Sequence, residues 1–252
     1  MHPIYILWAT PRSTSTAFEW MMRMRGDMTC FHEPFGEAWH QGDDARWPRL
    51  TPESPRQPGL TIVGVLQRLL KAAEERPVFS KDMPQYTDHL WDEAFLGRFC
   101  HSFLIRHPAK VLSSCARNWD HFVPKEIGFD DQRRLFDRLA ERDGRAPPVI
   151  DSDDLLTDPQ GIVAAWCDAL GIRFIPEALS WEPGARDEVL WYDKEQIWHD
   201  TLKKSDGLKP QKTRPADISK TPDWVQAMYR DFLPHYEHLH KYRIRVPSTA
   251  SS

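Results

Sequence analysis

The side chains best suited to binding an anion lie together in residues 10–16, which read Thr-Pro-Arg-Ser-Thr-Ser-Thr. An apolar run at residues 4–7 precedes them, and a segment of good helix formers at residues 17–25 follows. A strand, a tight turn and a helix N-terminus together favour an anion, because free backbone N–H groups and the helix dipole both attract negative charge. Arg12 adds a fixed cation. The hydroxyl groups beside it belong to Ser13, Thr14, Ser15 and Thr16. This segment therefore predicts a pocket for phosphate or for a group of similar shape.

Two residue types missing from this turn narrow the choice of anion. Loops that wrap a nucleoside triphosphate follow the pattern G-x-x-x-x-G-K-S/T, in which the Lys reaches the outer phosphates. Between Trp8 and Arg25 there is neither Gly nor Lys. A smaller anion, held by hydroxyl groups and one Arg, fits the segment better than a triphosphate with bound magnesium.

A second anion site is predicted within residues 103–114. An apolar run ends in Arg106, and Pro108 suits the first turn of a helix because its missing N–H has no helical partner there. Ser114 follows Arg106 by eight residues and lies inside that helix. In a purely structural alternative, Ser114 bonds to its own helix and Arg106 forms a surface ion pair. Their spacing favours a clamp for a second group of the phosphate type.

A parallel sheet is needed to bring these segments together. Apolar runs without strict alternation predict strands covered on both faces, and they lie at 4–9, 29–32, 78–81, 101–106 and 148–151. Helices are expected at 61–76, 108–119, 158–171 and 222–242. The alternation predicts an α/β fold with a mainly parallel sheet, whose ligands bind beyond the carboxyl ends of the strands. Long loops are expected at 42–59 and 203–222.

Composition describes an ordinary globular chain of 252 residues with a formal net charge of −4. A global attraction to nucleic acid is therefore not expected. No apolar run approaches the roughly 20 residues of a membrane span, and no leader pattern opens the chain, so we expect a cytoplasmic protein without membrane contact. The four cysteines form no C-x-x-C pair, which predicts reduced thiols and no zinc site. The surface pattern specifies no oligomeric state.

The chain resembles the sulfotransferases that use PAPS, 3′-phosphoadenosine 5′-phosphosulfate. Residues 10–16 are similar to their 5′-phosphosulfate loop, and Arg106 followed by Ser114 is similar to their 3′-phosphate motif. Residues 151–172 resemble a third run of the family, which reads E-D-L, then D-P, then L-G-I/V. All three segments occur in the order and spacing of the family, across about residues 3–172.

The resemblance implies a fold and an activity. The fold would be a three-layer αβα sandwich of the P-loop NTPase type, with one sulfotransferase domain over residues 1–247. This domain would have a nucleotide-binding core at about 3–172, a helical and loop region at 173–247, and a tail at 248–252. The enzyme would move a sulfonyl group from PAPS to a hydroxyl or amine of a small-molecule acceptor, without a metal.

The resemblance also implies roles for individual residues. Arg12, Ser13, Thr14, Ser15 and Thr16 would hold the 5′-phosphosulfate. Arg106 and Ser114 would hold the 3′-phosphate.

The chain departs from the family pattern at two places near the donor. Thr14 stands where Gly is common, so the loop is expected to avoid a backbone angle that only Gly tolerates. The distal G-x-x-G-x-x-K element is absent, and residues 203–209, with three Lys, occupy a similar place; residues 203–212 could close over the 3′-phosphate.

The proton acceptor is a third departure. Asp82 stands where the animal cytosolic members carry a His, and Lys81 beside it could neutralise the bridging or sulfonyl oxygens. If this segment is extended, Lys81 and Asp82 point to opposite faces and only one serves the site. Glu33, at the end of the second predicted strand, resembles the Glu that some bacterial members use. We rank Glu33 before Asp82, and the neighbouring His32 third. The structural alternative for the two acidic residues is a helix cap or a pair with an Arg, and for His32 it is an ordinary hydrogen-bonded histidine.

Two rival functions remain at this point. One is a kinase or other nucleotide-binding protein of the P-loop class, and the other is a non-catalytic sulfotransferase-like binding module. Acceptor loops are expected at residues 36–59, 121–130 and 181–198, and their Trp, Phe and Pro content indicates an apolar or aromatic acceptor.

Overall fold

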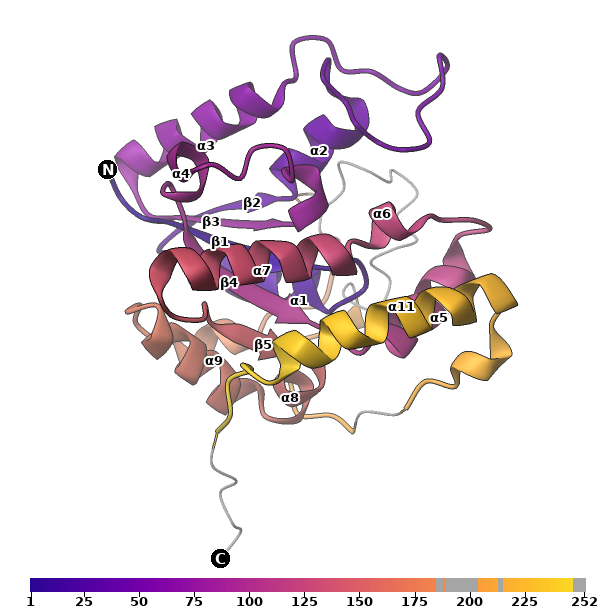
Figure 1. The fold of residues 1–252 in the computed structure, drawn as a ribbon. Coiled ribbons are helices and arrows are strands. Elements are labelled where there is room, and N and C mark those ends of the chain that lie inside the picture. The colour runs from indigo at the N-terminus through magenta and orange to yellow at the C-terminus, as the bar shows by residue number, and fades with distance from the viewer. Residues whose placement is uncertain (185–187, 189–203, 213–214, 247–252) are drawn as a thin grey trace, which may run out of the picture.

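The computed structural model describes residues 1–184, 188, 204–212 and 215–246. A five-stranded parallel sheet runs through the centre in the order β2-β3-β1-β4-β5 (Figure 1). The strands are β1 Ile4–Ala9, β2 Thr29–His32, β3 Val78–Asp82, β4 Cys100–Ile105 and β5 Val149–Asp151. Each predicted strand is confirmed to within one residue at either end.

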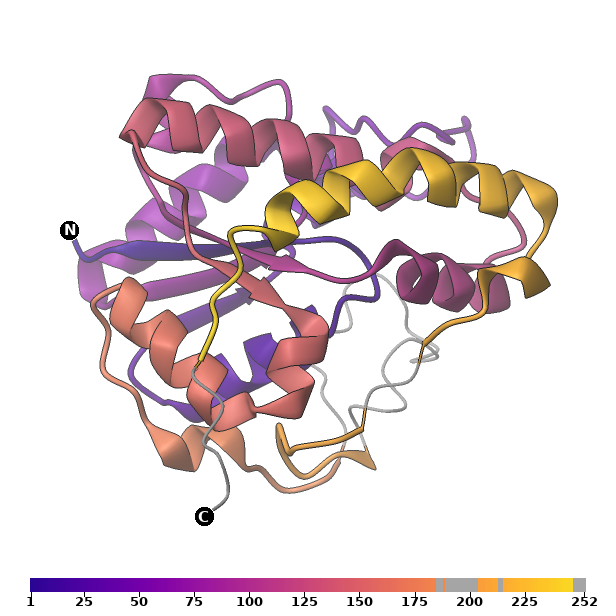
Figure 2. The same cartoon turned by 60° about the horizontal axis from the view of Figure 1, so that its bottom comes forward.

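The central strand β1 divides the core in two, because its side chains alternate between the faces of the sheet. Ile4, Ile6 and Trp8 pack with helices α2, α3, α7 and α11 on one face, whereas Tyr5, Leu7 and Ala9 pack with α1 and α9 on the other. Figure 2 shows the yellow α11 and the rose-coloured α7 on one side of the sheet and the indigo α1 on the other. The expected α/β fold with three αβα layers is confirmed.

The α-helices that form the outer layers and connections are α1 Ser15–Met24, α2 Pro34–Gln41, α3 Ile62–Glu75, α4 Glu93–Leu96, α5 Pro108–Asn118, α6 Pro124–Ile127, α7 Phe129–Asp143, α8 Ser152–Thr157, α9 Pro159–Ala169 and α11 Asp223–His240. Short 3₁₀ turns are η1 Pro84–Tyr86, η2 Pro176–Leu179 and η5 Ile218–Lys220. No helix in the described ranges is long and apolar enough to cross a bilayer.

Several predicted helix ends are confirmed by their capping contacts. The Thr61 side chain accepts the N–H of Gly64 at 3.0 Å, and the Asp158 side chain accepts that of Gly161 at 2.9 Å. Side-chain acceptors of this kind satisfy N–H groups that have no partner within the helix. Gly171 ends α9 with a φ of 66°, which is a left-handed conformation that favours glycine.

Two segments expected to be acceptor loops contain helices, so the loop expectation is wrong at residues 36–41 and at most of 121–130, whereas residues 42–59 contain no helix or strand. Residues 36–59 begin inside α2, and Trp39 of that helix is only 1% exposed in the core. Residues 121–130 contain α6 and the first residues of α7. The described part of 181–198 is small, and most of that range lies outside the described residues, as do residue 203 and the tail at 248–252.

The sheet order places a crevice between β1 and β4. The chain leaves β1 for β2, which lies beyond β3 on one side, and it leaves β4 for β5 on the other side; such a reversal opens a binding crevice at the carboxyl ends of strands. The buried Gln132 of α7 spans these ends, because its Nε2 donates to the carbonyl of Trp8 at 3.3 Å and to that of Leu104 at 3.1 Å.

Candidate active site

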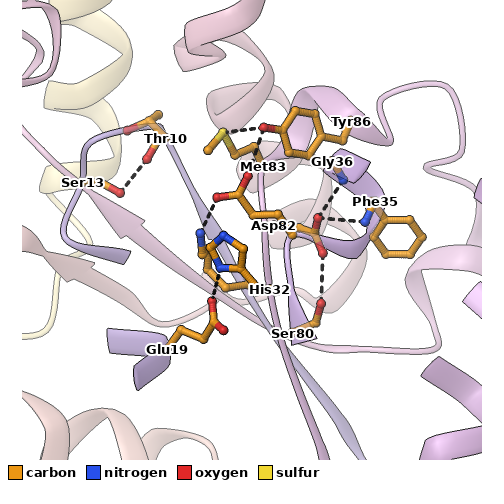
Figure 3. A network of polar contacts seen from close by, with 12 residues as sticks. Thr10, Ser13, Glu19, His32, Phe35, Gly36, Ser80, Asp82, Met83 and Tyr86 are labelled. Atoms are coloured by element: carbon orange, nitrogen blue, oxygen red, sulfur yellow. Dashed lines mark hydrogen bonds and ion pairs between the residues drawn. The ribbon is translucent and has the colours of Figure 1, made fainter. Parts of the chain in front are cut away.

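The turn after β1 forms the first arm of the site. The Ser13 hydroxyl donates to the carbonyl of Thr10 at 2.6 Å, which closes the turn on itself (Figure 3). Thr14 then precedes α1 with a φ of 74°, and Arg12 has a φ of 60°. The expectation that Thr14 avoids the glycine-type angle was therefore wrong, because the chain places a β-branched residue in that conformation.

The second predicted arm meets the first. The Arg106 guanidinium donates from Nη1 to the carbonyl of Arg12 at 2.6 Å. Arg12 in turn donates from Nε to the Ser114 hydroxyl at 3.0 Å. Both arms grow from neighbouring strands, β1 and β4, and the contacts join residues about one hundred positions apart in the chain. The two predicted anion motifs thus form one site.

A cavity of about 370 Å³ lies between these arms. It has the size of a small-molecule site, which typically spans about 300–1,000 Å³. All seven predicted donor-binding residues line it; they are Arg12, Ser13, Thr14, Ser15, Thr16, Arg106 and Ser114. Arg117 adds a third guanidinium, and no acidic side chain is among the described residues of the lining.

Burial makes this cavity receptive to an anion. Desolvation lowers the pKa of Arg12 and of Arg106, although arginine remains charged in proteins. The Nε of Arg106 is buried, and no described residue accepts its hydrogen bond. A bound anion would compensate this desolvation and supply the missing acceptor.

Sequence reasoning missed part of the lining. Arg117 lies near the end of α5, one turn beyond Ser114, and its helical spacing from that residue could have revealed it. Leu156 of α8 also lines the cavity, together with Ser205, Gly207 and Gln211. The described residues 204–212 thus contribute to the lining of this cavity.

Glu33 and Lys81 meet at the ends of β2 and β3. The Lys81 ammonium donates to one carboxylate oxygen of Glu33, and the Tyr86 hydroxyl lies 3.4 Å from the other. Burial would raise the pKa of Glu33, but the charges of Lys81 and His32 lower it to about 2. A Cβ at position 36 would lie 2.6 Å from the Tyr86 ring, so Gly36 permits this close approach.

Asp82 has a different environment from Glu33. Its carboxylate accepts the N–H groups of Phe35 at 3.1 Å and Gly36 at 3.3 Å, and the Ser80 hydroxyl at 2.9 Å (Figure 3). It therefore caps α2 from a neighbouring strand, which leaves the Glu33 side chain available for Lys81. Burial, followed by the nearby Glu33 charge, raises the pKa of Asp82 well above its usual value. As expected for an extended segment, Lys81 and Asp82 serve opposite sides of β3.

The His32 side chain contacts a buried carboxylate of α1. Its Nδ1 lies 2.6 Å from an Oε of Glu19, a fully buried residue of α1 (Figure 3). Because a carboxylate only accepts, Nδ1 carries the hydrogen. Glu19 also pairs with Arg23 at 2.8 Å. We refer to Glu19, His32, Glu33 and Lys81 as the buried charge cluster.

Backbone strain is concentrated at this site. Among the described residues other than glycine, Arg12, Thr14 and Glu33 alone have a positive φ. Each such residue costs about 1–3 kcal/mol and persists only where its surroundings hold it. All three were predicted as site residues from the sequence.

Aromatic rings lie beside Glu33. The His40 ring contacts those of Trp39, Trp47 and Tyr86, at centroid distances of 4.7, 5.5 and 6.0 Å. Burial lowers the pKa of His40 to about 4, so its ring is neutral near pH 7. The Trp47 indole donates to Glu126 of α6 at 2.8 Å, which joins residues from two of the expected acceptor segments.

Comparison with known proteins identifies the family. Residues 4–241 match the family described as "Sulfotransferase domain". The chain belongs to this sulfotransferase family. The described residues hold no group of three or more His, Cys, Asp or Glu side chains that could bind a metal ion.

Solved sulfotransferases share the fold at low sequence identity. The sulfotransferase domain from the Synechococcus PCC 7002 olefin synthase has a TM-score of 0.54 and 19% identity, covering 92% of this chain and 94% of that one. The sulfotransferase from Alicyclobacillus acidocaldarius has a TM-score of 0.52 and 13% identity, covering 97% and 98%.

The curated relatives of this sulfotransferase chain have names that refer to aminotransferases. Branched-chain-amino-acid aminotransferase-like protein 2 of Arabidopsis thaliana is 27% identical over 217 residues, which is 81% of this chain and 36% of that protein. Protein 1 of the same name and organism is 23% identical over 210 residues, 82% of this chain and 37% of that protein. The chain spans about a third of the length of these relatives.

Proposed function

We propose that this chain is a PAPS-dependent sulfotransferase that passes a sulfonyl group to a hydroxyl or amine of a small-molecule acceptor. The observation that carries the proposal is the contact between Arg12 and Ser114, which joins the two anion motifs in one cavity. A ligand with two separated phosphate-type groups suits two such arms, and PAPS is a ligand of this kind.

The donor would lie across both arms. Residues 12–16 and the N-terminus of α1 would hold the 5′-phosphosulfate through hydroxyl groups, backbone N–H groups and one cation. Arg106 and Ser114 would hold the 3′-phosphate. Arg117 would add charge on the same side, because it lines the cavity one turn after Ser114.

Transfer requires a base and a group that stabilises the leaving phosphate. The acceptor oxygen or nitrogen forms a bond to sulfur, and the bond between sulfur and the bridging oxygen breaks. The bridging oxygen keeps the electron pair, so 3′,5′-ADP leaves, and the acceptor proton passes to Glu33. Lys81 would donate to the bridging or sulfonyl oxygens as negative charge develops there.

The Glu33–Lys81 pair couples donor binding to base strength. In the free enzyme the Lys81 charge helps to hold the pKa of Glu33 low, which makes this carboxylate a weak base. A bound sulfonate competes for the Lys81 ammonium. As Lys81 turns toward the donor, the pKa of Glu33 rises and proton transfer becomes easier.

An aromatic or otherwise apolar acceptor fits the rings beside Glu33. His40, Trp47 and Tyr86 present ring surfaces near the carboxylate that would take the proton. Aromatic side chains bind flat apolar groups and still leave a polar edge for a hydroxyl.

Titration calorimetry with 3′,5′-ADP tests the donor assignment. We expect wild-type binding, and a loss of about 10- to 100-fold in affinity for Arg12→Ala and for Arg106→Ala, because each removes a charge-assisted contact. Arg98→Ala is the matched control, since Arg98 is an exposed residue that bonds to the carbonyl of Ala94. Absence of wild-type binding, or equal binding by all variants, would contradict the proposal.

A radiolabelled-PAPS screen against a panel of phenols, alcohols and amines tests the reaction itself. Label transfer that needs no added metal is expected. Turnover of ATP with magnesium would instead identify a kinase, and 3′,5′-ADP binding without transfer to any acceptor would identify a binding module.

A further inference from the structure

The phosphosulfate loop contains a residue in an unfavourable conformation. Thr14 has a φ of 74° and a ψ of 4°, although it is β-branched. Glycine adopts this region without cost, whereas a side chain that branches at Cβ is strongly disfavoured there. The surroundings of Thr14 must therefore hold it in this conformation.

The Thr14 hydroxyl makes its contact outside the loop. It lies 2.8 Å from the hydroxyl of Ser152, within hydrogen-bonding distance, and its side chain does not cap α1. Ser152 is fully buried and is the first residue of α8. Loss of this contact would release the Thr14 side chain from α8.

The first turn of α8 is itself firmly held. Asp151 accepts the N–H groups of Asp153 at 2.8 Å and Asp154 at 3.2 Å, and it also accepts the Tyr236 hydroxyl of α11 at 2.9 Å. The Lys110 ammonium of α5 contacts the Asp153 carboxylate at 2.6 Å. The residues on either side of Ser152 are thus held by contacts within α8 and with α5 and α11.

We propose that Ser152 is a positioning residue, which holds Thr14 in the glycine-type conformation and thereby shapes the donor site. This inference rests on the proposed function for its ligand, but its structural part does not. Ser152 compensates for the absence of glycine at position 14, so its importance depends on which residue stands there.

That dependence gives a double-mutant cycle over wild type, Ser152→Ala, Thr14→Gly and the double variant. Ser152→Ala should weaken 3′,5′-ADP binding about 5- to 10-fold when Thr14 is present, as expected for the loss of one hydrogen bond. In the Thr14→Gly background the same change should alter binding less than about twofold, because glycine needs no brace. Thr157→Ala is the control; its hydroxyl bonds within α8, to the carbonyl of Asp153, at 2.7 Å.

The outcomes separate the inference from the proposed function. An equal loss of binding in both backgrounds, or no loss in either, would overturn the positioning role. Urea unfolding of the same four proteins gives a second cycle that needs no ligand. If wild type fails to bind 3′,5′-ADP, the donor assignment fails, and the unfolding cycle still decides whether Ser152 and Thr14 are coupled; additive midpoint shifts would overturn the inference.

Discussion

The cavity between the two arms and the buried charge cluster lie at the strand ends of one sheet, yet they hold their charges in opposite ways. The cavity brings Arg12, Arg106 and Arg117 to an open space without an acidic neighbour in the described lining. The charge cluster pairs Lys81 with Glu33 and His32 with Glu19. The described lining of the cavity supplies cations without a carboxylate, whereas the cluster places each carboxylate against a donor of its own.

This difference separates binding from chemistry. Binding of an anion stabilises a cavity lined by buried cations, because the anion replaces lost solvation. In the proposed mechanism, the cluster must exchange partners before it reacts, so its reactivity depends on what the cavity holds. The comparison predicts that variants of the cavity change affinity, whereas variants of the cluster change rate or stability.

The largest effect is expected for the base. Glu33→Gln removes the proposed proton acceptor and should lower the transfer rate by about 10²- to 10⁴-fold, the usual contribution of a general base. Binding of 3′,5′-ADP should change little, because Glu33 does not line the cavity. The rate is measured with radiolabelled PAPS and the best acceptor from the screen.

Glu37→Gln is the control for this substitution, since Glu37 lies in α2, the helix that follows Glu33, and its side chain pairs with Arg68 at 3.6 Å. A Glu33→Gln enzyme that retains the wild-type rate would remove Glu33 as the base. A loss of donor binding in that variant would show that cavity and cluster are not separable.

Stability in acid gives a second, smaller effect. Glu33 has a pKa of about 2 in the folded chain, below its ordinary value of 4.5. Its ion pair therefore stabilises the fold above about pH 4.5, and this contribution is lost as the pH falls toward 2. Glu33→Gln should reduce the free energy of unfolding by about 3 kcal/mol at neutral pH, because it leaves the buried Lys81 unpaired.

The measurement is urea unfolding of wild type and Glu33→Gln between pH 7 and pH 2. The difference between the two proteins should shrink as the solution becomes more acidic. A difference that stays constant across this range would mean that Glu33 is not ionised in the folded chain at neutral pH.

The smallest effect on rate is expected at Asp82. Asp82→Asn keeps an oxygen for the N–H groups of Phe35 and Gly36, so it should lower the free energy of unfolding by about 1 kcal/mol. The transfer rate should stay within a few-fold of wild type. Asp92→Asn is a matched control, because Asp92 caps α4 through the N–H of Phe95 at 2.8 Å.

A rate that falls as far in Asp82→Asn as in Glu33→Gln would assign Asp82 to the chemistry. Rate assays and urea unfolding of the two variants side by side distinguish a cap from a base.

The sequence predicts most of the donor site because its signals are local. A strand followed by hydroxyl groups, and an Arg with a Ser eight residues later, mark both arms without knowledge of the fold. A parallel sheet then suffices to bring Arg12 and Ser114 together. The strands are predicted equally well, since each is a short apolar run.

The parts that sequence reasoning missed depend on distant contacts. Helix α2 begins where Asp82 accepts its N–H groups, and Asp82 lies on another strand. The φ of Thr14 depends on Ser152, more than one hundred residues away. Helix α7 did have a local signal, because Gly128 and Gly144 flank an amphipathic run and both adopt left-handed angles.

The contacts of Gln132 affect which ligand lengths the enzyme would accept. Its amide nitrogen donates to a carbonyl group near the end of β1 and to another near the end of β4. The arms that follow therefore start from anchors whose spacing belongs to the sheet, about 4.8 Å between neighbouring strands. A sheet is far stiffer than a loop, so the span between the two anion positions works as a fixed ruler. Nucleotides whose charged groups are a different distance apart would bind poorly, whatever contacts they make with Glu33.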